Sequence, residues 1–506
     1  MADMFRRGLV GGLAAACVPA AAAARLRDGA RIGWPCDVPS WDPQHRFVPD
    51  AQPIYKMVFD QPLDQDTRQA LVPGLVTAWE MAPDAMSLEL ELRDRVVFHD
   101  GSPMTSADFR WSFLERIRAG HRVDTAHAWR KVVEIETPGA TRAVMRFASP
   151  APTAPAWLAF LGSFVVPKAY MERVGLEGFG AKPVGTGPYR LVEYQANARM
   201  VLERNEAYWG PRPSLRRITV EIIRDVAARV AAVQSGQVDL TVAVPVREVQ
   251  RLDGLGALSA ELNPISRVTL LQVRHDAGFA DGNIRLAAHY AIDKVALSRA
   301  FTNEVAVPLS VPAVPGTPGF LDEFTFPHDP NIAIELLARS GHSDAAPARI
   351  RMATTRGQFP GDYDMARAIV AMWRKVGIEA ALEVIGHARY FELARGNRLP
   401  EATLYSFDNA TGDPEIGVGT LLHPLLPFSP WKDMALGHRV IELFDAADEL
   451  EEAARIAAWR AVTREAVETG ACMPLLQSVQ TLVRRKALSY RLYGNGWVLP
   501  QTMDWV

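Results

Sequence analysis

The sequence predicts an α/β protein with more than one domain, and three observations support this prediction. The chain has 506 residues with 48% hydrophobic composition, which is more than one hydrophobic core usually holds. Strand patterns alternate with helix patterns along much of its length. Charged residues contribute 22% of the chain, and no tract of low complexity occurs, so a disordered or fibrous protein is not expected.

The first 24 residues have the pattern of a secretory signal peptide. Arg6 and Arg7 precede an apolar stretch at residues 8–18, and the alanines at 20–24 suit a cleavage site. The apolar stretch is shorter than the ~20 residues that a bilayer span requires. We therefore expect export by the Sec route, with Tat as an alternative because of the twin arginine, and cleavage rather than lipid attachment at Cys17.

A strand, a tight turn and a capped helix are predicted near residue 100. Apolar and polar residues alternate over 87–93, and residues 96–98 are expected to continue this strand. Residues 99–101 form the turn. Thr105 can cap the following helix, with Asp108 three residues further on.

Further strands and helices follow in alternation. Strand patterns occur at residues 189–193, 199–204, 218–222 and 378–384, and helix patterns at 366–376, 440–447 and 451–467. A helix from Val226 to Gly236 separates the strand at 218–222 from one that opens at 238–240. Such a strand-helix-strand unit favours parallel strands.

Five short motifs occur in a fixed order. They are FHDGSPMTSADF at 98–109, PVGTGPY at 183–189, RNEAYWG at 204–210, QSGQVD at 234–239 and AIDK at 291–294. Together they resemble the family 5 extracellular solute-binding proteins, which serve dipeptide, oligopeptide, nickel and related ABC importers. We interpret Gly101, Gly185 and Gly187 as positions where the backbone turns tightly, so the motifs define the scaffold and not the pocket.

The resemblance implies a fold of the periplasmic binding protein-like II class, cluster C. In this fold two lobes are joined by crossing segments around a hinge cleft, and an extra domain is inserted. The implied domains are a signal peptide at 1–24, a discontinuous lobe I at 25–55, 183–265 and 478–506, an inserted domain II at 56–182, and lobe III at 266–477.

The resemblance also implies a function by binding and not by catalysis. A monomeric periplasmic protein would capture a small organic solute, peptide-like or acidic, and deliver it to an ABC permease and its ATPase at the inner membrane. Presentation of the ligand to a chemoreceptor or sensor is an alternative, and a cleft enzyme is less favoured because the G-x-S-x-G, phosphate-loop and H-E-x-x-H motifs are missing. No cofactor is expected.

Two further partner classes are not expected. The formal charge of -3 and the scattered basic residues argue against nucleic acid. The eleven histidines show no H-x-H pair and no i,i+4 pair, so no metal site is predicted. Cys36 and Cys472 remain after signal-peptide removal, and whether they pair is open.

The resemblance suggests which residues contact the solute. In peptide-binding relatives an aspartate shortly before an Asp-Pro pair holds the peptide ammonium. Alignment on Asp413-Pro414 places Phe407 where that motif has tryptophan and Ala410 where it has the aspartate. The ammonium anchor is then missing unless Asp408 replaces it, which shifts the expected cargo towards an acidic solute.

Other predicted contacts come from three further segments. Arg356 aligns with an arginine that grips a ligand carboxylate in the dipeptide-binding branch. Trp34 and Asp37 lie with Cys36 in a loop that faces the cleft in relatives, and Trp129 lies with His127 in a loop that supplies an aromatic wall in the nickel-binding branch. The predicted ligand-binding residues are Trp34, Asp37, Trp129, Arg356, Phe407, Asp408 and Ala410.

Overall fold

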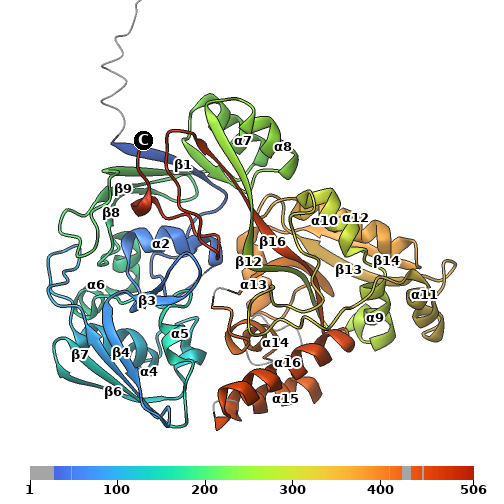
Figure 1. Cartoon of the computed structure of the whole chain (residues 1–506), viewed down its shortest axis with the longest axis horizontal. Helices are drawn as coiled ribbons and strands as arrows, with labels where there is room; N and C mark the ends of the chain where they lie inside the picture. The colour runs from blue at the N-terminus through green and yellow to red at the C-terminus, as the bar shows by residue number, and fades with distance from the viewer. Residues whose placement is uncertain (1–27, 47, 410, 424–434, 447–448) are drawn as a thin grey trace, which may run out of the picture.

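The computed structural model describes residues 28–46, 48–409, 411–423, 435–446 and 449–506 (Figure 1). The predicted signal peptide at 1–24 and Ala410 lie outside these residues. No helix in the described ranges is both long and apolar enough to cross a membrane.

One ten-stranded sheet extends through the molecule in the order β14-β13-β15-β12-β16-β11-β1-β10-β9-β8. Its strands are β1 (Gly29–Trp34), β8 (Tyr189–Gln195), β9 (Arg199–Arg204), β10 (Arg217–Ile222), β11 (Leu240–Val242), β12 (Leu258–Val273), β13 (Ala348–Thr354), β14 (Ile378–Val384), β15 (Ala402–Asp408) and β16 (Cys472–Arg485). β10 and β11 both pair in parallel with β1, which lies between them, whereas β12 and β16 are antiparallel. The predicted parallel unit is therefore confirmed, with a third strand inside it.

β12 and β16 link the two halves of this sheet. The C-terminal part of β12 pairs with β15, and the C-terminal end of β16 pairs with β11. Their common ladder shifts register between Pro264 and Val268, where proline lacks the amide hydrogen that a ladder needs. Figure 1 shows both strands running from one half of the molecule to the other. They are crossing segments of the kind that the resemblance implied, while the exact domain boundaries stay a prediction.

A separate antiparallel sheet in the order β4-β5-β7-β6 lies within residues 76–147. Its strands are β4 (Val76–Met81), β5 (Ser87–Leu92), β6 (Val132–Gly139) and β7 (Arg142–Phe147), and the pair β2 (Leu63–Gln65) and β3 (Leu71–Pro73) precedes it. The leucines of β5 are buried while the residues between them are more exposed, as the alternation predicts. This sheet forms the lower left part of Figure 1.

The strand, turn and capped helix near residue 100 are confirmed with one correction. Thr105 and Asp108 form a capping box at the start of α3 (Ser106–Arg110), in which the Thr105 amide donates to the Asp108 carboxylate over 2.9 Å. Residues 96–98 do not continue β5 but form only an isolated bridge. A turn in which Arg95 has a φ of 58° ends the strand first.

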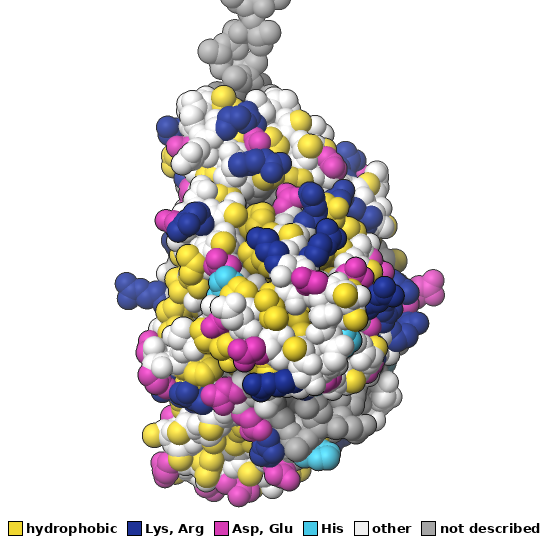
Figure 2. Space-filling model, turned by 90° about the vertical axis from the view of Figure 1, so that its right-hand side faces the viewer, with side chains coloured by type: hydrophobic (Ala, Val, Ile, Leu, Met, Phe, Trp, Pro, Cys, Tyr) yellow, Lys and Arg dark blue, Asp and Glu magenta, His cyan; other side chains and the backbone are white. Residues whose placement is uncertain are grey.

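Helices flank both sheets. The remaining α-helices are α2 (Gln52–Val58), α4 (Arg116–Arg118), α5 (Ala154–Leu158), α6 (Lys168–Ala181), α7 (Val226–Ser235), α8 (Val246–Asp253), α9 (Gly282–Tyr290), α10 (Lys294–Thr302), α11 (Pro330–Arg339), α12 (Asp362–Arg374), α13 (His387–Arg395), α14 (Thr420–Leu422), α15 (Ala435–Ala446) and α16 (Glu452–Glu468). α7 ends at Gly236, whose φ of 82° is left-handed, as the sequence predicts. Basic and acidic side chains are interspersed on the face shown in Figure 2.

Two of the three motif glycines are required by close packing, although Gly187 also lies in the bend predicted there, at residues 186–188. Gly101 has a φ of 88° and does form a tight turn, but Gly185 and Gly187 do not have positive φ. They lie against the end of α2 instead. A Cβ atom on Gly185 would be 2.1 Å from the carbonyl oxygen of Val58, and one on Gly187 would be 2.5 Å from its carbonyl carbon. Glycine is needed there for a close backbone approach.

Gly187→Ala is therefore expected to lower the free energy of unfolding by about 1–3 kcal/mol, the usual cost of overpacking. The new methyl group overlaps backbone atoms, which cannot rotate away as a side chain can. Gly180→Ala in α6 is the matched control, because no atom lies within 4 Å of its Cβ position, and it should gain about 0.5–1 kcal/mol. Urea unfolding of both proteins measures the difference, and equal stabilities would contradict the close-approach explanation.

Candidate functional site

Two adjoining cavities lie where the halves of the large sheet meet. The inner pocket is lined by side chains of β12, β15 and β16 and by the loops after β1 and β13, and its volume is about 70 Å³. The outer pocket shares Pro35 and Gln358 with it and has a volume of about 300 Å³. Its lining comes from residues 35–39, 46, 48, 197, 224, 355–358, 385–388, 391 and 395. Segments from both halves of the sheet thus enclose one continuous cleft.

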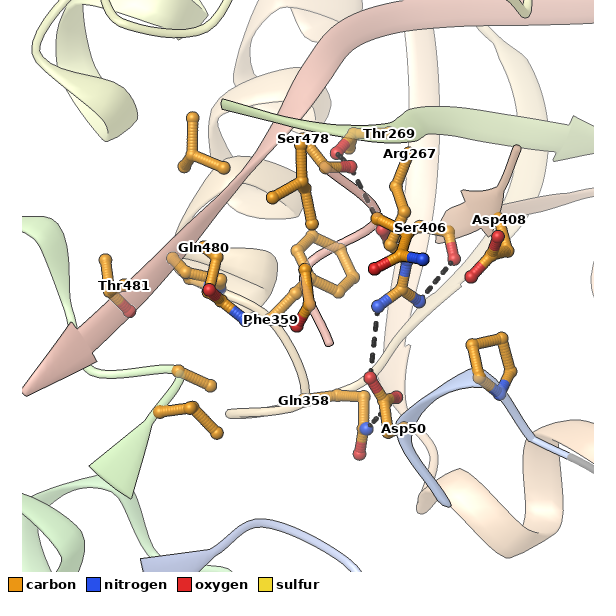
Figure 3. Close-up of a pocket in the computed structure, with 18 of the residues that line it drawn as sticks. Asp50, Arg267, Thr269, Gln358, Phe359, Ser406, Asp408, Ser478, Gln480 and Thr481 are labelled. Atoms are coloured by element: carbon orange, nitrogen blue, oxygen red, sulfur yellow. Dashed lines mark hydrogen bonds and ion pairs between the residues drawn. The ribbon is translucent and has the colours of Figure 1, made fainter. Parts of the chain in front are cut away.

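An ion pair crosses the inner pocket. Asp50, in the short helix η1 (Pro49–Ala51), accepts from Arg267 on β12 over 3.0 Å, and Gln358 donates to its second oxygen over 2.5 Å (Figure 3). Burial alone would raise the pKa of Asp50, but the Arg267 charge and these hydrogen bonds outweigh it and lower that pKa. Arg267 also donates to the Ser406 carbonyl over 3.1 Å. The charges of this pocket are therefore largely engaged with one another.

Apart from the Asp408 carboxylate, the rest of the inner pocket is polar but uncharged, with aromatic walls. The hydroxyl of Ser478 lies 2.9 Å from that of Thr269 and 3.0 Å from that of Ser406. Aromatic rings of Trp34, Phe359 and Trp497 complete the lining. Apolar walls with a few fixed polar groups are typical of small-molecule sites.

The outer pocket is strongly basic. Its lining contains Arg46, Arg224, Arg356 and Arg395 but one acid, Asp37, which leaves a formal charge of +3 when His387 is counted as neutral. His387 is neutral near pH 7 because burial lowers its pKa. Such a concentration of guanidinium groups favours anions.

The partners of these groups decide which charges are available. Arg395 is paired with Asp124 over 2.6 Å. Asp37 accepts from the Tyr194 hydroxyl over 2.8 Å and from the backbone amide of Asn197 over 2.6 Å. Within the described ranges, the other three arginines form no ion pair with a carboxylate, and the Arg356 guanidinium lies 3.9 Å from the centre of the Tyr363 ring. Three exposed arginines therefore have no carboxylate partner, and of these Arg224 donates a hydrogen bond to the side-chain oxygen of Asn197.

The structure brings four of the predicted residues to the cleft. Trp34 and Asp408 line the inner pocket, and Asp37 and Arg356 line the outer one. Sequence reasoning missed Arg46, Arg224 and the pair of Asp50 with Arg267, because no local motif marks them. Ala410 lies outside the described residues.

The side chains of the other predicted residues pack inside the protein and do not line either pocket. Phe407 lies between two lining residues of β15, and its ring packs against the hydrophobic cores instead of lining the inner pocket. Trp129 is 4% exposed and packs edge-on against Phe113, with ring centres 5.0 Å apart. His127 packs against Trp157 at 5.3 Å. Neither Trp129 nor His127 lines the inner or the outer pocket.

The two cysteines of the described chain are both buried and unpaired, which settles the question left open above. Cys36 lines the outer pocket. Burial and the neighbouring Asp50 charge raise the pKa of its thiol far above the usual range, so it is protonated at neutral pH. It is a buried thiol beside a carboxylate and an imidazole.

Comparisons with known proteins agree with this geometry. The profile of the family described as bacterial extracellular solute-binding proteins, family 5 Middle, matches residues 70–425. The chain therefore belongs to this family, as its motifs predict. The nickel-binding periplasmic protein of Escherichia coli K12 is 27% identical over 412 residues, which cover 76% of this chain and 75% of that protein.

Solved structures confirm the predicted fold. A dipeptide-binding protein of Pseudoalteromonas sp. SM9913 in complex with Met-Leu superposes with a TM-score of 0.86 at 17% identity, covering 94% of this chain and 100% of that one. A periplasmic binding protein of Agrobacterium tumefaciens R10 in complex with mannopinic acid has a TM-score of 0.84 at 20% identity, covering 94% and 99%. At these identities the likeness establishes the type II periplasmic binding protein fold and does not define the ligand.

Proposed function

We propose that this chain is the periplasmic solute-binding component of an ABC importer and that its cargo is a small organic acid. Family membership and a relative named as a nickel-binding periplasmic protein support the importer role and the location. The observation that carries the cargo class is the outer pocket, with its three arginines that have no carboxylate partner.

The arrangement of these arginines suits a carboxylate ligand. Each guanidinium can donate two parallel hydrogen bonds to one carboxylate. Arg46 and Arg224 belong to segments near β1 and β10, whereas Arg356 follows β13 on the other half of the sheet. An anion between them would attract both halves and favour the closed cleft, which is the form a permease recognises in this class of protein.

A free amino group has less to bind in this cleft. Asp408 lines the inner pocket, but it lies directly opposite Arg267 in the ladder between β12 and β15. The Arg267 guanidinium interacts electrostatically with both Asp408 and Asp50. An ammonium group would have to compete with that guanidinium for the carboxylate. This supports an acidic solute without an obligatory amine over an ordinary peptide.

A thermal-shift panel tests the cargo class. Di- and tricarboxylates such as succinate, glutarate and citrate should raise the melting temperature, because a ligand at 100 times its Kd adds about 2.7 kcal/mol of stability. Unblocked dipeptides should not. Mass spectrometry of solute released from the denatured protein provides an independent identification. Stabilisation by unblocked dipeptides alone would overturn the acidic-cargo proposal.

Substitution of the outer-pocket arginines tests the site. Arg356→Ala and Arg224→Ala should each weaken binding of the stabilising carboxylate by about 10-fold or more, the effect of losing a charged hydrogen bond of about 1.5–3 kcal/mol. Arg339→Ala is the control, since that exposed side chain pairs only loosely with Glu335 at 3.8 Å on α11. Calorimetric titration measures all three proteins. If Arg339→Ala weakens binding as much as the other two, the outer pocket is not the site.

A further inference from the structure

We propose that Cys36, Asp50 and His387 form a binding site for one divalent transition-metal ion across the cleft. A thiol sulfur, a carboxylate oxygen and an imidazole nitrogen all lie within 4.8 Å of one another. Cys36 and Asp50 belong to the segment between β1 and α2, whereas His387 begins α13. The site does not depend on the proposed organic cargo, because all three ligands come from the chain itself.

His387 provides a second observation that points to a ligand. Both of its ring nitrogens are shielded from solvent, and neither has a hydrogen-bond partner among the described residues. The ring stands edge-on against Phe391, with centres 5.0 Å apart, which orients it without using either nitrogen. Buried polar atoms are seldom left unpaired, because each one costs about 1–3 kcal/mol. An ion bound by one nitrogen would remove part of this cost.

The neighbouring side chains position the other two ligands. The Gln358 amide donates to Asp50 over 2.5 Å and lies 3.9 Å from the Cys36 sulfur. The Arg267 guanidinium donates to the other Asp50 oxygen over 3.0 Å. Hydrogen bonds of this kind are typical of the groups that orient metal ligands.

The charges around the cluster balance when a divalent ion is bound. Binding breaks the Cys36 S–H bond, forms a sulfur–metal bond and releases the proton to solvent. The thiolate and the Asp50 carboxylate then offset the two charges of the ion. The positive charge of Arg267 is offset in turn by Asp408, which lies directly opposite it in the ladder between β12 and β15. The charges of the ion, Cys36, Asp50, Arg267 and Asp408 therefore sum to zero.

The donor set indicates the kind of ion. Thiolate, imidazole and carboxylate together suit Zn²⁺ and the neighbouring divalent ions, whereas Mg²⁺ and Ca²⁺ prefer oxygen donors alone. Three protein ligands leave a fourth position for water or a small ligand from the outer pocket, which Cys36 and His387 line. Because the ligands come from both halves of the molecule, the bound ion would hold the cleft closed.

Zn²⁺ titration of the chelator-treated full chain, prepared without a histidine tag, tests the proposal. Calorimetry should show one ion per chain. Cys36→Ser and His387→Gln should each weaken Zn²⁺ binding by about 100-fold, the scale of losing one direct ligand, or about 2.7 kcal/mol. Cys472→Ser and His438→Gln are the matched controls, since Cys472 is buried elsewhere and His438 is exposed on α15.

Co²⁺ gives a second readout, which reports directly on a sulfur ligand. The Co²⁺-loaded wild-type protein should show a thiolate-to-cobalt charge-transfer band that is lost in Cys36→Ser and kept in Cys472→Ser. Thermal melting without metal establishes that each variant is folded. Any of three results would overturn the proposal. The wild-type protein could fail to bind one Zn²⁺ per chain, or it could bind one Zn²⁺ but show no charge-transfer band when loaded with Co²⁺. The third result is that folded Cys36→Ser and His387→Gln bind Zn²⁺ with the wild-type affinity.

Discussion

Arg116→Met is expected to lower the free energy of unfolding by about 3–5 kcal/mol. The Arg116 side chain is fully buried on α4 and forms an ion pair of 2.5 Å with Asp42, which is 3% exposed. It also donates to the Gln44 side chain over 2.8 Å. Methionine keeps the apolar volume but leaves the Asp42 carboxylate buried without a counter-ion. Urea unfolding at neutral pH measures the loss.

An exposed ion pair supplies the control for this prediction. Arg142 and Glu89 also approach to 2.5 Å, but their side chains are 56% and 52% exposed, so Arg142→Met should cost less than about 1 kcal/mol. Adding Asp42→Asn to Arg116→Met should recover part of the loss, since the buried charge is then removed. Similar losses for Arg116→Met and Arg142→Met would contradict the argument from burial.

Sequence reasoning succeeded where a structure depends on a few neighbouring residues. The capping box of Thr105 and Asp108 and the end of α7 at Gly236 are both set within one helical turn, and both are present. The glycines at 185 and 187 show the limit of such reasoning. The atoms that require them belong to α2, far away in the chain, so the sequence indicated glycine without revealing why.

The same limit explains the result for the candidate site. Alignment on the Asp-Pro motif correctly predicted that β15 borders the cleft. It could not predict which side chains of that strand face the pocket. Successive residues of a strand point to opposite faces, so Asp408 lines the pocket and Phe407 does not. The cluster of Cys36, Asp50 and His387 is assembled from distant segments, and a search for histidine pairs at local spacing does not detect it.

Lys294→Met is expected to raise the free energy of unfolding at pH 7 by about 2–4 kcal/mol. The Lys294 ammonium is buried, donates to the Leu309 carbonyl over 2.8 Å and forms no ion pair within the described residues. Burial lowers its pKa from 10.5 to about 7. This difference corresponds to about 5 kcal/mol, from which the unpaired Leu309 carbonyl of the variant subtracts about 1–3 kcal/mol.

The pH dependence distinguishes this explanation from a simple gain in packing. Because the pKa of Lys294 is lower in the folded state, the unfolded chain holds the additional proton between about pH 7 and pH 10.5, so wild-type stability rises with pH across this window. The advantage of Lys294→Met should therefore be complete below about pH 7 and decrease steadily towards pH 10.5. Urea unfolding of both proteins at about pH 6 and about pH 9.5 measures this decrease. An advantage that does not change with pH would assign the gain to packing, and a less stable variant at pH 7 would show that burial of the ammonium carries no such cost.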